Sequence, residues 1–389
     1  MPITLILGLI GVTATFNQRL FDPLTPLIAT SFGVHTDLAV LLAPAVTLPF
    51  ALGQPFLGPL GDAYGKALML KICSVLMALS ALGAALAPNY ETLFAMRMLA
   101  GFAAGGIVPA SIAIIADRYP MAERQVAMSR FMTVMMMGQV MIAPASASLA
   151  EAIGWQPVIL AAGLIALLGF ALAKLRLPPR PGAVRTPLSL SGALATYRTI
   201  LADSRARTCY AVAAVEGIFI FGFPPHMALI LKEMGLGGVQ EAGFVLAAHG
   251  VGGLLFAAMI GRLAQRFPLH ALMQAGAICA AVGLFALPLM PHWGTVAVAS
   301  GLVGFGFFLL HSGLQTEITE VLPSARASVV SLHAFFMFIG VATGPVVFGW
   351  MDTVVHARGA FWISAAVMLI VGIAGTALLK RRVASLDPL

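Results

Sequence analysis

The sequence predicts an all-α polytopic membrane protein, with twelve transmembrane helices in two pseudo-symmetric six-helix bundles. Hydrophobic residues make up 60% of the 389 residues and charged residues only 10%, against about 25% charged residues in soluble domains. Apolar runs of about 20 residues recur along the chain, which is long enough to cross hydrocarbon as helices. Strand-like alternation is absent, which excludes a closed barrel. Gly101 and Gly304, like Pro120 and Pro323, lie 203 positions apart, which indicates an internal duplication.

We expect six spans on each side of a polar insert. The predicted spans are roughly 4–30, 38–60, 67–87, 91–115, 124–149, 156–175, 209–231, 240–261, 269–290, 293–316, 325–350 and 358–379. The residues before the first span are too few for a cleavable signal, and the span itself is too long for a signal core. It is therefore expected to stay in the membrane.

The distribution of lysine and arginine predicts the orientation. With the N-terminus inside, Lys232 and Arg358 are the only basic residues in external loops, and most of the 22 basic residues are cytoplasmic. This predicts a protein of the cell inner (plasma) membrane with cytoplasmic N- and C-termini. The net charge of +7 then requires no nucleic acid partner.

The polar insert divides the predicted domains. Residues 1–175 form an N-terminal bundle, 176–207 a cytoplasmic linker, and 208–389 a C-terminal bundle. Prolines at the start of the linker block helix continuation. Leu190, Leu194, Tyr197 and Leu201 then recur at helical spacing, which suggests an amphipathic helix on the inner leaflet. A solvated basic linker is the alternative.

The chain resembles the major facilitator superfamily over essentially its whole length, and three segments carry the resemblance. Gly58-x-x-x-Asp62-x-x-Gly65-Lys66 is similar to the superfamily's loop between spans two and three, with Ala63 where the family often has arginine. The other two match twelve-span drug:proton antiporters. They are Arg97-Met-Leu-Ala-Gly101-Phe-Ala-Ala-Gly105 followed by Pro109, and Asp22-Pro23 followed by Pro26. Span five of these antiporters normally carries a Gly-x-x-x-Gly-Pro motif. Here that segment reads Gln139-x-x-x-Ala143-Pro144, without the glycines, and span eleven carries Gly340-x-x-x-Gly344-Pro345 instead.

The resemblance implies a secondary transporter and not an enzyme, without a cofactor or metal. We expect a monomer in the lipid bilayer that exports a small organic solute or drug in exchange for protons, by rocker-switch alternating access. The sequence also lacks the glycine-rich phosphate loop of ATPases, so a gradient must supply the energy.

Ionisable residues inside spans are costly and are therefore candidates for function. Asp22 and Arg97 lie at similar predicted depth in the outer half of the N-terminal bundle, where they could form a proton-sensitive pair. A static ion pair is the alternative. Arg19 lies one helical turn before Asp22, next to Asn17, nearer the midplane where transporters bind substrates.

Further residues are assigned to the cavity and its gate. Glu216, His226, His311 and Gln315 are expected to line the cavity with Asn17 and Arg19, since His311 and Gln315 share one helix face. Arg130 could form an inner gate with Glu216, although both could instead extend their head groups to the interface.

By resemblance, the loop with Gly58, Asp62, Gly65 and Lys66 latches the bundles on the cytoplasmic face. Asp117 and Glu123 are among its plausible partners. A solvated turn is the alternative.

Two rival functions remain open. One is an importer or facilitator of an organic anion that uses Arg19 and Arg130. The other is a membrane-embedded metal-binding protein that uses His226, His249, His311 and His333, because histidine is a common metal ligand.

Overall fold

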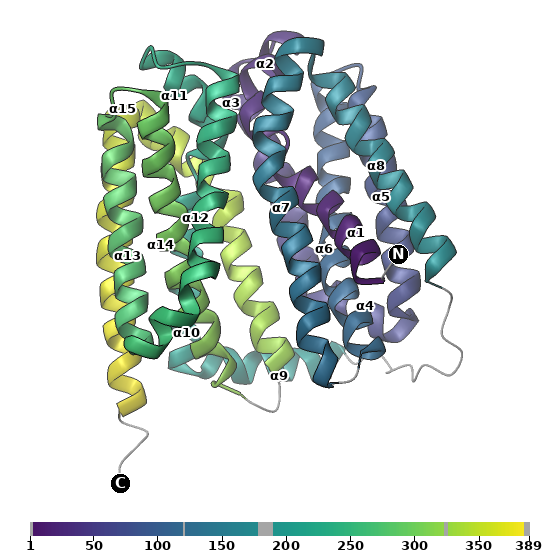
Figure 1. The fold of residues 1–389 in the computed structure, drawn as a ribbon, viewed down its shortest axis with the longest axis vertical. Helices are drawn as coiled ribbons and strands as arrows, with labels where there is room; N and C mark the ends of the chain where they lie inside the picture. Colours follow the sequence, from purple (N-terminus) through teal and green to yellow (C-terminus); the bar gives the residue numbers. More distant parts are fainter. Residues whose placement is uncertain (1–2, 120, 178–189, 323–325, 385–389) are drawn as a thin grey trace. The chain divides into compact units, whose positions relative to one another are not determined.

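The fold is described from a computed structural model, which describes residues 3–119, 121–177, 190–322 and 326–384. Every regular element in these ranges is a helix. The chain divides into two compact units, Met1–Ser189 and Leu190–Leu389. Within each unit the long helices run side by side (Figure 1).

The first unit contains eight α-helices and one 3-10 turn. They are α1 (Ile3–Arg19), η1 (Asp22–Leu24), α2 (Thr25–Phe32), α3 (Thr36–Val40), α4 (Leu42–Tyr64), α5 (Lys66–Ala85), α6 (Tyr90–Arg118), α7 (Met121–Ile153) and α8 (Trp155–Arg176). Capping side chains fix several ends. Asn89, for example, accepts a hydrogen bond from the Thr92 backbone N–H at 2.9 Å and so starts α6. Gly65 separates α4 from α5 with a φ of +104°, a conformation that favours glycine.

The second unit contains the remaining helices. They are α9 (Leu190–Ala202), α10 (Ser204–Phe221), η2 (Pro224–His226), α11 (Met227–Glu233), α12 (Val239–Arg266), α13 (Leu269–Ala286), η3 (Leu287–Leu289), α14 (Trp293–Thr319) and α15 (Arg326–Ala384). Asp203 caps α10 by accepting hydrogen bonds from the backbone N–H groups of Arg205 and Ala206, at 2.7 and 2.9 Å.

The predicted helical membrane fold is confirmed. Among the described residues, eleven helices are long and apolar enough to span a membrane, and the last of them covers 53 residues. At about 1.5 Å per residue that helix is far longer than the roughly 30 Å of a bilayer core. It contains a sharp break at His356, whose φ is 60° and ψ is 163°. The break lies between the predicted spans 325–350 and 358–379, so α15 provides two passes.

Two spans predicted as continuous helices are interrupted instead. The first span breaks between α1 and α2 at η1, and the seventh breaks between α10 and α11 at η2. Both 3-10 turns contain proline, Pro23 in η1 and the pair Pro224 and Pro225 in η2. Proline lacks the backbone N–H that a continuing helix needs. The two breaks occupy corresponding positions in the two halves.

The duplication is also visible in the packing. A Cβ on Gly101 would lie 2.8 Å from the carbonyl carbon of Val46, and a Cβ on Gly304 would lie 2.8 Å from that of His249. Gly101 and Gly304 are 203 residues apart, and so are Val46 and His249. The crossing of α4 with α6 is therefore built in the same way as that of α12 with α14. In both, the missing side chain lets two helix backbones meet.

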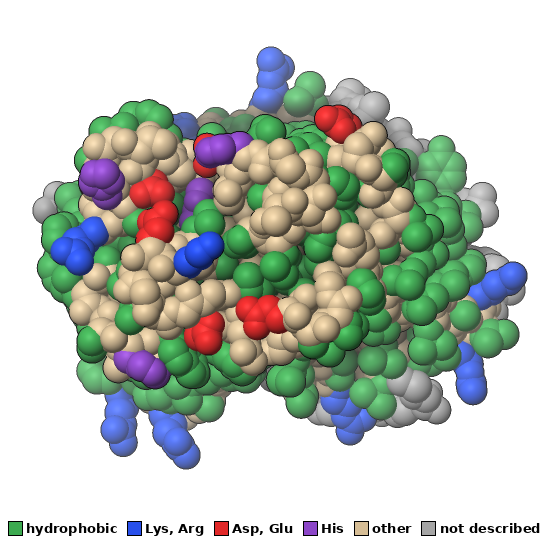
Figure 2. Space-filling view, turned by 90° about the horizontal axis from the view of Figure 1, so that it is seen from above, with side chains coloured by type: hydrophobic (Ala, Val, Ile, Leu, Met, Phe, Trp, Pro, Cys, Tyr) green, Lys and Arg blue, Asp and Glu red, His purple; other side chains and the backbone are tan. Residues whose placement is uncertain are grey.

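The outer surfaces of the helices are apolar. Leu164, Leu168, Val298 and Ile370 are all more than half exposed, and the end-on view shows hydrophobic side chains over much of the visible flank (Figure 2). Such extensive exposed apolar surface fits contact with lipid.

The linker contains the expected helix, α9, and one side of it packs against the second unit. Leu194 is 59% exposed, whereas Ile200 is 1% exposed and the Tyr197 hydroxyl forms a hydrogen bond with Ser331 of α15. Burial raises the pKa of the Tyr197 phenol. The helix thus belongs to the second unit, and Leu194 and Leu201 form its exposed apolar side. The first part of the linker, 178–189, lies outside the described residues.

Candidate functional site

Arg97 is the largest of the fully buried side chains. Its Nε donates a hydrogen bond to the Leu42 carbonyl at 3.2 Å, and its Nη1 donates to the Asn17 carbonyl. The guanidinium carbon lies 4.1 Å from the centre of the Phe21 ring, within range of a cation–π interaction. Because α1 ends at Arg19, the Asn17 carbonyl belongs to its last turn and lacks a partner within the helix. Arg97 therefore stabilises the break in the first span.

Asp22 is paired with Arg19 rather than Arg97. The Asp22 Oδ2 and Arg19 Nη1 lie 3.3 Å apart, and the two side chains are 4% and 24% exposed. The expected direct pair of Asp22 with Arg97 is not found among the described residues, because the Arg97 donors are directed at backbone carbonyls. Arg97 still interacts electrostatically with Asp22. We call Arg19, Asp22 and Arg97 the N-half charge cluster.

Glu216 and His311 form a buried pair in the second unit. Glu216 is fully buried in α10 and His311 is 8% exposed in α14. The His311 Nδ1 lies 2.8 Å from the Glu216 Oε2, and the His311 Nε2 lies 3.3 Å from the Gln315 amide nitrogen. The helical spacing of His311 and Gln315 thus places them together, as the sequence indicated. Their contact with Glu216, which is 95 positions from His311, could not be derived from spacing.

Other histidines surround this pair. The His333 ring of α15 lies 4.9 Å from that of His311, and the Phe307 ring stacks on His311 at 5.1 Å. The His249 ring lies 5.6 Å from Phe221. His226 is placed apart, with its Nε2 3.0 Å from the Pro345 carbonyl oxygen. The histidines are held by aromatic and backbone contacts. No group of three or more metal-binding side chains occurs within the described part of the chain, so the metal-binding alternative has no support.

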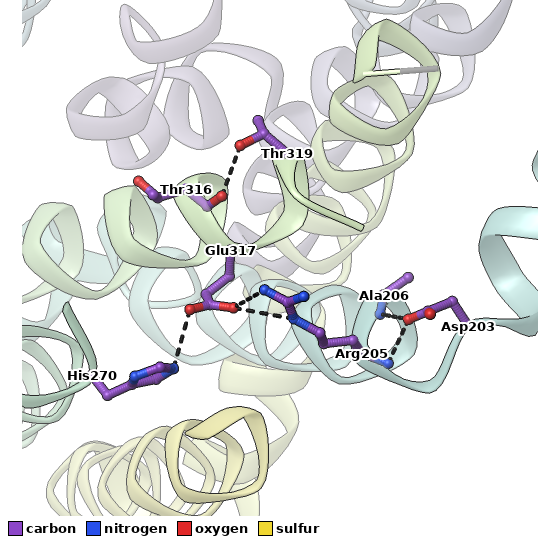
Figure 3. Close-up of polar contacts among 7 residues, drawn as sticks. All are labelled: Asp203, Arg205, Ala206, His270, Thr316, Glu317 and Thr319. Carbon is purple, nitrogen blue, oxygen red and sulfur yellow. Dashed lines mark hydrogen bonds and ion pairs between the residues drawn. The ribbon is translucent and has the colours of Figure 1, made fainter. Parts of the chain in front are cut away.

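A third polar cluster was not predicted from the sequence. The Arg205 Nη2 lies 2.7 Å from the Glu317 Oε2, and the His270 Nε2 lies 3.1 Å from the Glu317 Oε1 (Figure 3). The histidine is at ion-pair distance, although this nitrogen makes no well-aligned hydrogen bond. Glu317 is 5% exposed. The cluster ties α10, α13 and α14 together at one end of the unit, and only the charge of Glu317 near the end of a predicted span could have indicated it.

The predicted latch between the bundles stays a prediction, because the one described contact of its residues lies within the first unit. The Lys66 Nζ donates to both Asp117 carboxylate oxygens, at 3.1 and 2.9 Å, and so joins the start of α5 to the end of α6. The side chains of Gly58 and Asp62 lie outside the described residues. Arg130 is exposed on α7. The inner gate of Arg130 with Glu216 remains a prediction.

Two repeated units of apolar spanning helices, each with ionisable side chains buried inside them, define the class as a polytopic membrane transporter. The sequence pattern of the Major Facilitator Superfamily matches residues 7–332 and again 238–388. The chain belongs to this superfamily. It is therefore a multi-pass membrane transporter and not an enzyme.

Relatives and solved structures agree with this assignment. The chain is 24% identical to a multi-drug resistance efflux pump PmrA homolog of Lactococcus lactis, over 94% of this chain and 91% of that protein. It is 25% identical to the multidrug resistance protein MdtG of Citrobacter koseri, over 97% and 94% of the two chains. A 30% identical match to YdgK of Bacillus subtilis, an uncharacterized MFS-type transporter, spans about half of either chain, 52% and 51%.

Among solved structures, an inward-facing bacterial homolog of the human lysosomal transporter Spinster has a TM-score of 0.77 at 17% identity. It covers 97% of this chain and 96% of that one. A D-xylose–proton symporter has a TM-score of 0.74 at 18% identity, with the same two coverages. At these identities the likeness supports the fold alone.

Proposed function

We propose that this protein is a proton-coupled exporter of small organic solutes or drugs in the bacterial plasma membrane. The observation that carries the proposal is the match to the PmrA homolog and MdtG over more than nine-tenths of this chain. Both are named for multidrug resistance. Local matches of sequence around Asp22 and Arg97 support the same branch of the superfamily.

Alternating access would use the interruptions in the first and seventh spans. A broken helix exposes backbone carbonyls and N–H groups that can bind a substrate, and transporters place such breaks near their binding sites. Arg19 ends α1 directly before the first break, Gln315 contacts His311 of the buried pair, and both retain exposed surface. We assign them to the substrate cavity, with Asn17, Glu216, His226 and His311 as the supporting residues. Lys66 with Asp117 is assigned to the cytoplasmic latch.

The proposed orientation places both termini in the cytoplasm, because lysine and arginine are concentrated in the loops on that side. We propose a monomer as the working unit. The rival function, import of an organic anion, would need the charge of Arg19 for the substrate. Arg19 is already ion-paired with Asp22, and the relatives named for multidrug resistance favour export.

Transport by purified protein in proteoliposomes tests the proposal. With ethidium as the probe and an imposed pH gradient, the dye should move against its own gradient while protons move the opposite way. Vesicles with the pH gradient collapsed by an ionophore are the control. Dye movement that does not respond to the pH gradient would refute proton coupling, and uptake of an organic anion under the same gradient would support the rival function.

A further inference from the structure

Two of the buried carboxylates in the spans, Asp22 and Glu216, differ in the charges beside them. Asp22 lies 3.3 Å from Arg19 and interacts electrostatically with Arg97. Both partners are arginines, which stay charged at all accessible pH values. The N-half charge cluster therefore places two permanent cations near one carboxylate, and Asp22 needs no proton to be neutralised.

Glu216 has no such permanent partner. Among the described residues, its ion pair is with His311 alone, and a histidine carries a charge only when a proton is bound. The Glu216 Oε1 is buried and accepts no hydrogen bond from any described group. An ionised carboxylate in an apolar membrane interior is costly. The charge of this pair must therefore be balanced by a proton.

The other titratable groups around the pair do not supply a fixed charge either. They are Tyr210 on α10, His249 on α12 and His333 on α15, all close to the same aromatic cluster. The Tyr210 hydroxyl donates a hydrogen bond to the Val329 carbonyl at 3.1 Å. Of the arginines on α10, Arg205 is bound to Glu317 at 2.7 Å, and Arg207 is exposed and donates to the Leu201 and Ala202 carbonyls.

The hydrogen bonds fix which atom is open to the proton. The Gln315 amide nitrogen is placed to donate to the His311 Nε2, so that nitrogen is an acceptor and the ring proton lies on Nδ1. The Nδ1–H then donates to the Glu216 Oε2. Glu216 Oε1 is left as the one free acceptor of the pair. Gln315 itself is exposed, so the cluster reaches within one side chain of the surface of its unit.

We propose that Glu216 Oε1 is the proton-binding site of this transporter, held ready by His311 and Gln315. In the empty state the pair consists of a carboxylate and a neutral imidazole, with a net charge of −1. A proton from water forms an O–H bond at Oε1, and the pair becomes neutral while His311 keeps its Nδ1–H. Breaking that O–H bond returns the proton to water. The role in transport rests on the proposed function, whereas proton binding itself does not.

Infrared difference spectroscopy of the purified protein between two pH values tests this directly. A protonated carboxyl group in an apolar site gives its own carbonyl stretching band. Wild type should gain this band as the pH falls, and Glu216→Gln should lose it. Glu233→Gln, which removes an exposed carboxyl at the end of the same span, is the matched control and should keep it. Asp22→Asn should keep it as well.

A second variant covers the case in which Glu216→Gln does not fold. His311→Asn removes the imidazole donor, so the carboxyl band should remain but shift in frequency. A wild-type spectrum without the band, a band that survives Glu216→Gln, or a band lost in Asp22→Asn would overturn the proposal. Equally, an unshifted band in His311→Asn would contradict the role of His311.

Transport measurements separate this proposal from the proposed function. If wild type moves ethidium under a pH gradient, transport by Glu216→Gln should no longer respond to that gradient. If transport by Glu216→Gln still responds, the assignment of Glu216 is wrong although proton coupling stands. If ethidium transport by wild type does not respond to the pH gradient but the carboxyl band is present, proton coupling is refuted and the assignment of the proton site is retained.

Discussion

Replacing Gly101 by alanine should separate α4 from α6. The added Cβ would lie 2.8 Å from the carbonyl carbon of Val46, and closer still to its oxygen, whereas ordinary contacts lie at 3.4–4 Å. The obstructing atoms belong to the backbone of α4, so no side-chain rotation can relieve the overlap. One helix must move, and the packing around both must change.

The expected loss of stability follows from this geometry. Overpacking of a close-packed interior costs about 1–3 kcal/mol, and the gain from replacing a helical glycine by alanine, about 0.5–1 kcal/mol, does not offset it. For a unit of this size, 1 kcal/mol corresponds to about 2–4 °C in Tm. Gly101→Ala should therefore melt several degrees below wild type in detergent.

The repeat supplies a second variant and the chain supplies a control. Gly304→Ala meets the backbone of His249 at the same 2.8 Å and should be destabilised to a similar extent. Gly261 has nothing within 4 Å of its added Cβ, so Gly261→Ala should melt at or slightly above the wild-type temperature. If Gly101→Ala melted like Gly261→Ala, the close approach of α4 and α6 would be refuted.

Three further predictions concern the ion pairs, each checked by thermal melting of purified protein. Asp22→Asn leaves a largely buried arginine without its counter-charge and should lower the free energy of unfolding by up to about 3 kcal/mol. A variant as stable as wild type would contradict the pair. Glu317→Leu should lower the stability of the protein for the same reason. Adding Arg205→Met should restore much of that stability, since a matched apolar pair can replace a buried ion pair. Lys66→Ala should cost only about 0–1 kcal/mol, because Asp117 is 46% exposed; a larger loss would show that the exposed pair does more than a surface contact.

Much of the fold could be predicted because membrane spans obey a simple rule. Backbone groups in hydrocarbon must be bonded within the segment, so long apolar runs become helices. Proline lacks the N–H that a continuing helix needs, and Pro23 and the pair Pro224 and Pro225 lie at the breaks. That they interrupt the spans with a short 3-10 turn, instead of bending them, depends on packing around each break, such as the contact of Arg97 with the Asn17 carbonyl.

The candidate site was predicted less well than the fold. The cost of burying a charge selected Asp22, Arg97 and Glu216, the family motifs supported the first two, and helical spacing joined His311 to Gln315. Choice of the partner could not be made for Asp22 from the sequence alone, and the structure pairs it with Arg19 at 3.3 Å. No partner was predicted for Glu317, whose partners Arg205 and His270 come from two other helices.

The sequence by itself determined the class of protein, the number of passes, the duplication and the residues too costly to bury without a purpose. These follow from hydropathy and spacing, which act along a single helix. The tertiary structure decided which charges meet. It placed Asp22 near permanent cations and, among the described residues, gave Glu216 a histidine as its ion-pair partner. Such contacts depend on how helices far apart in sequence cross, at glycines such as Gly101 and Gly304, and no local rule along the chain specifies that crossing.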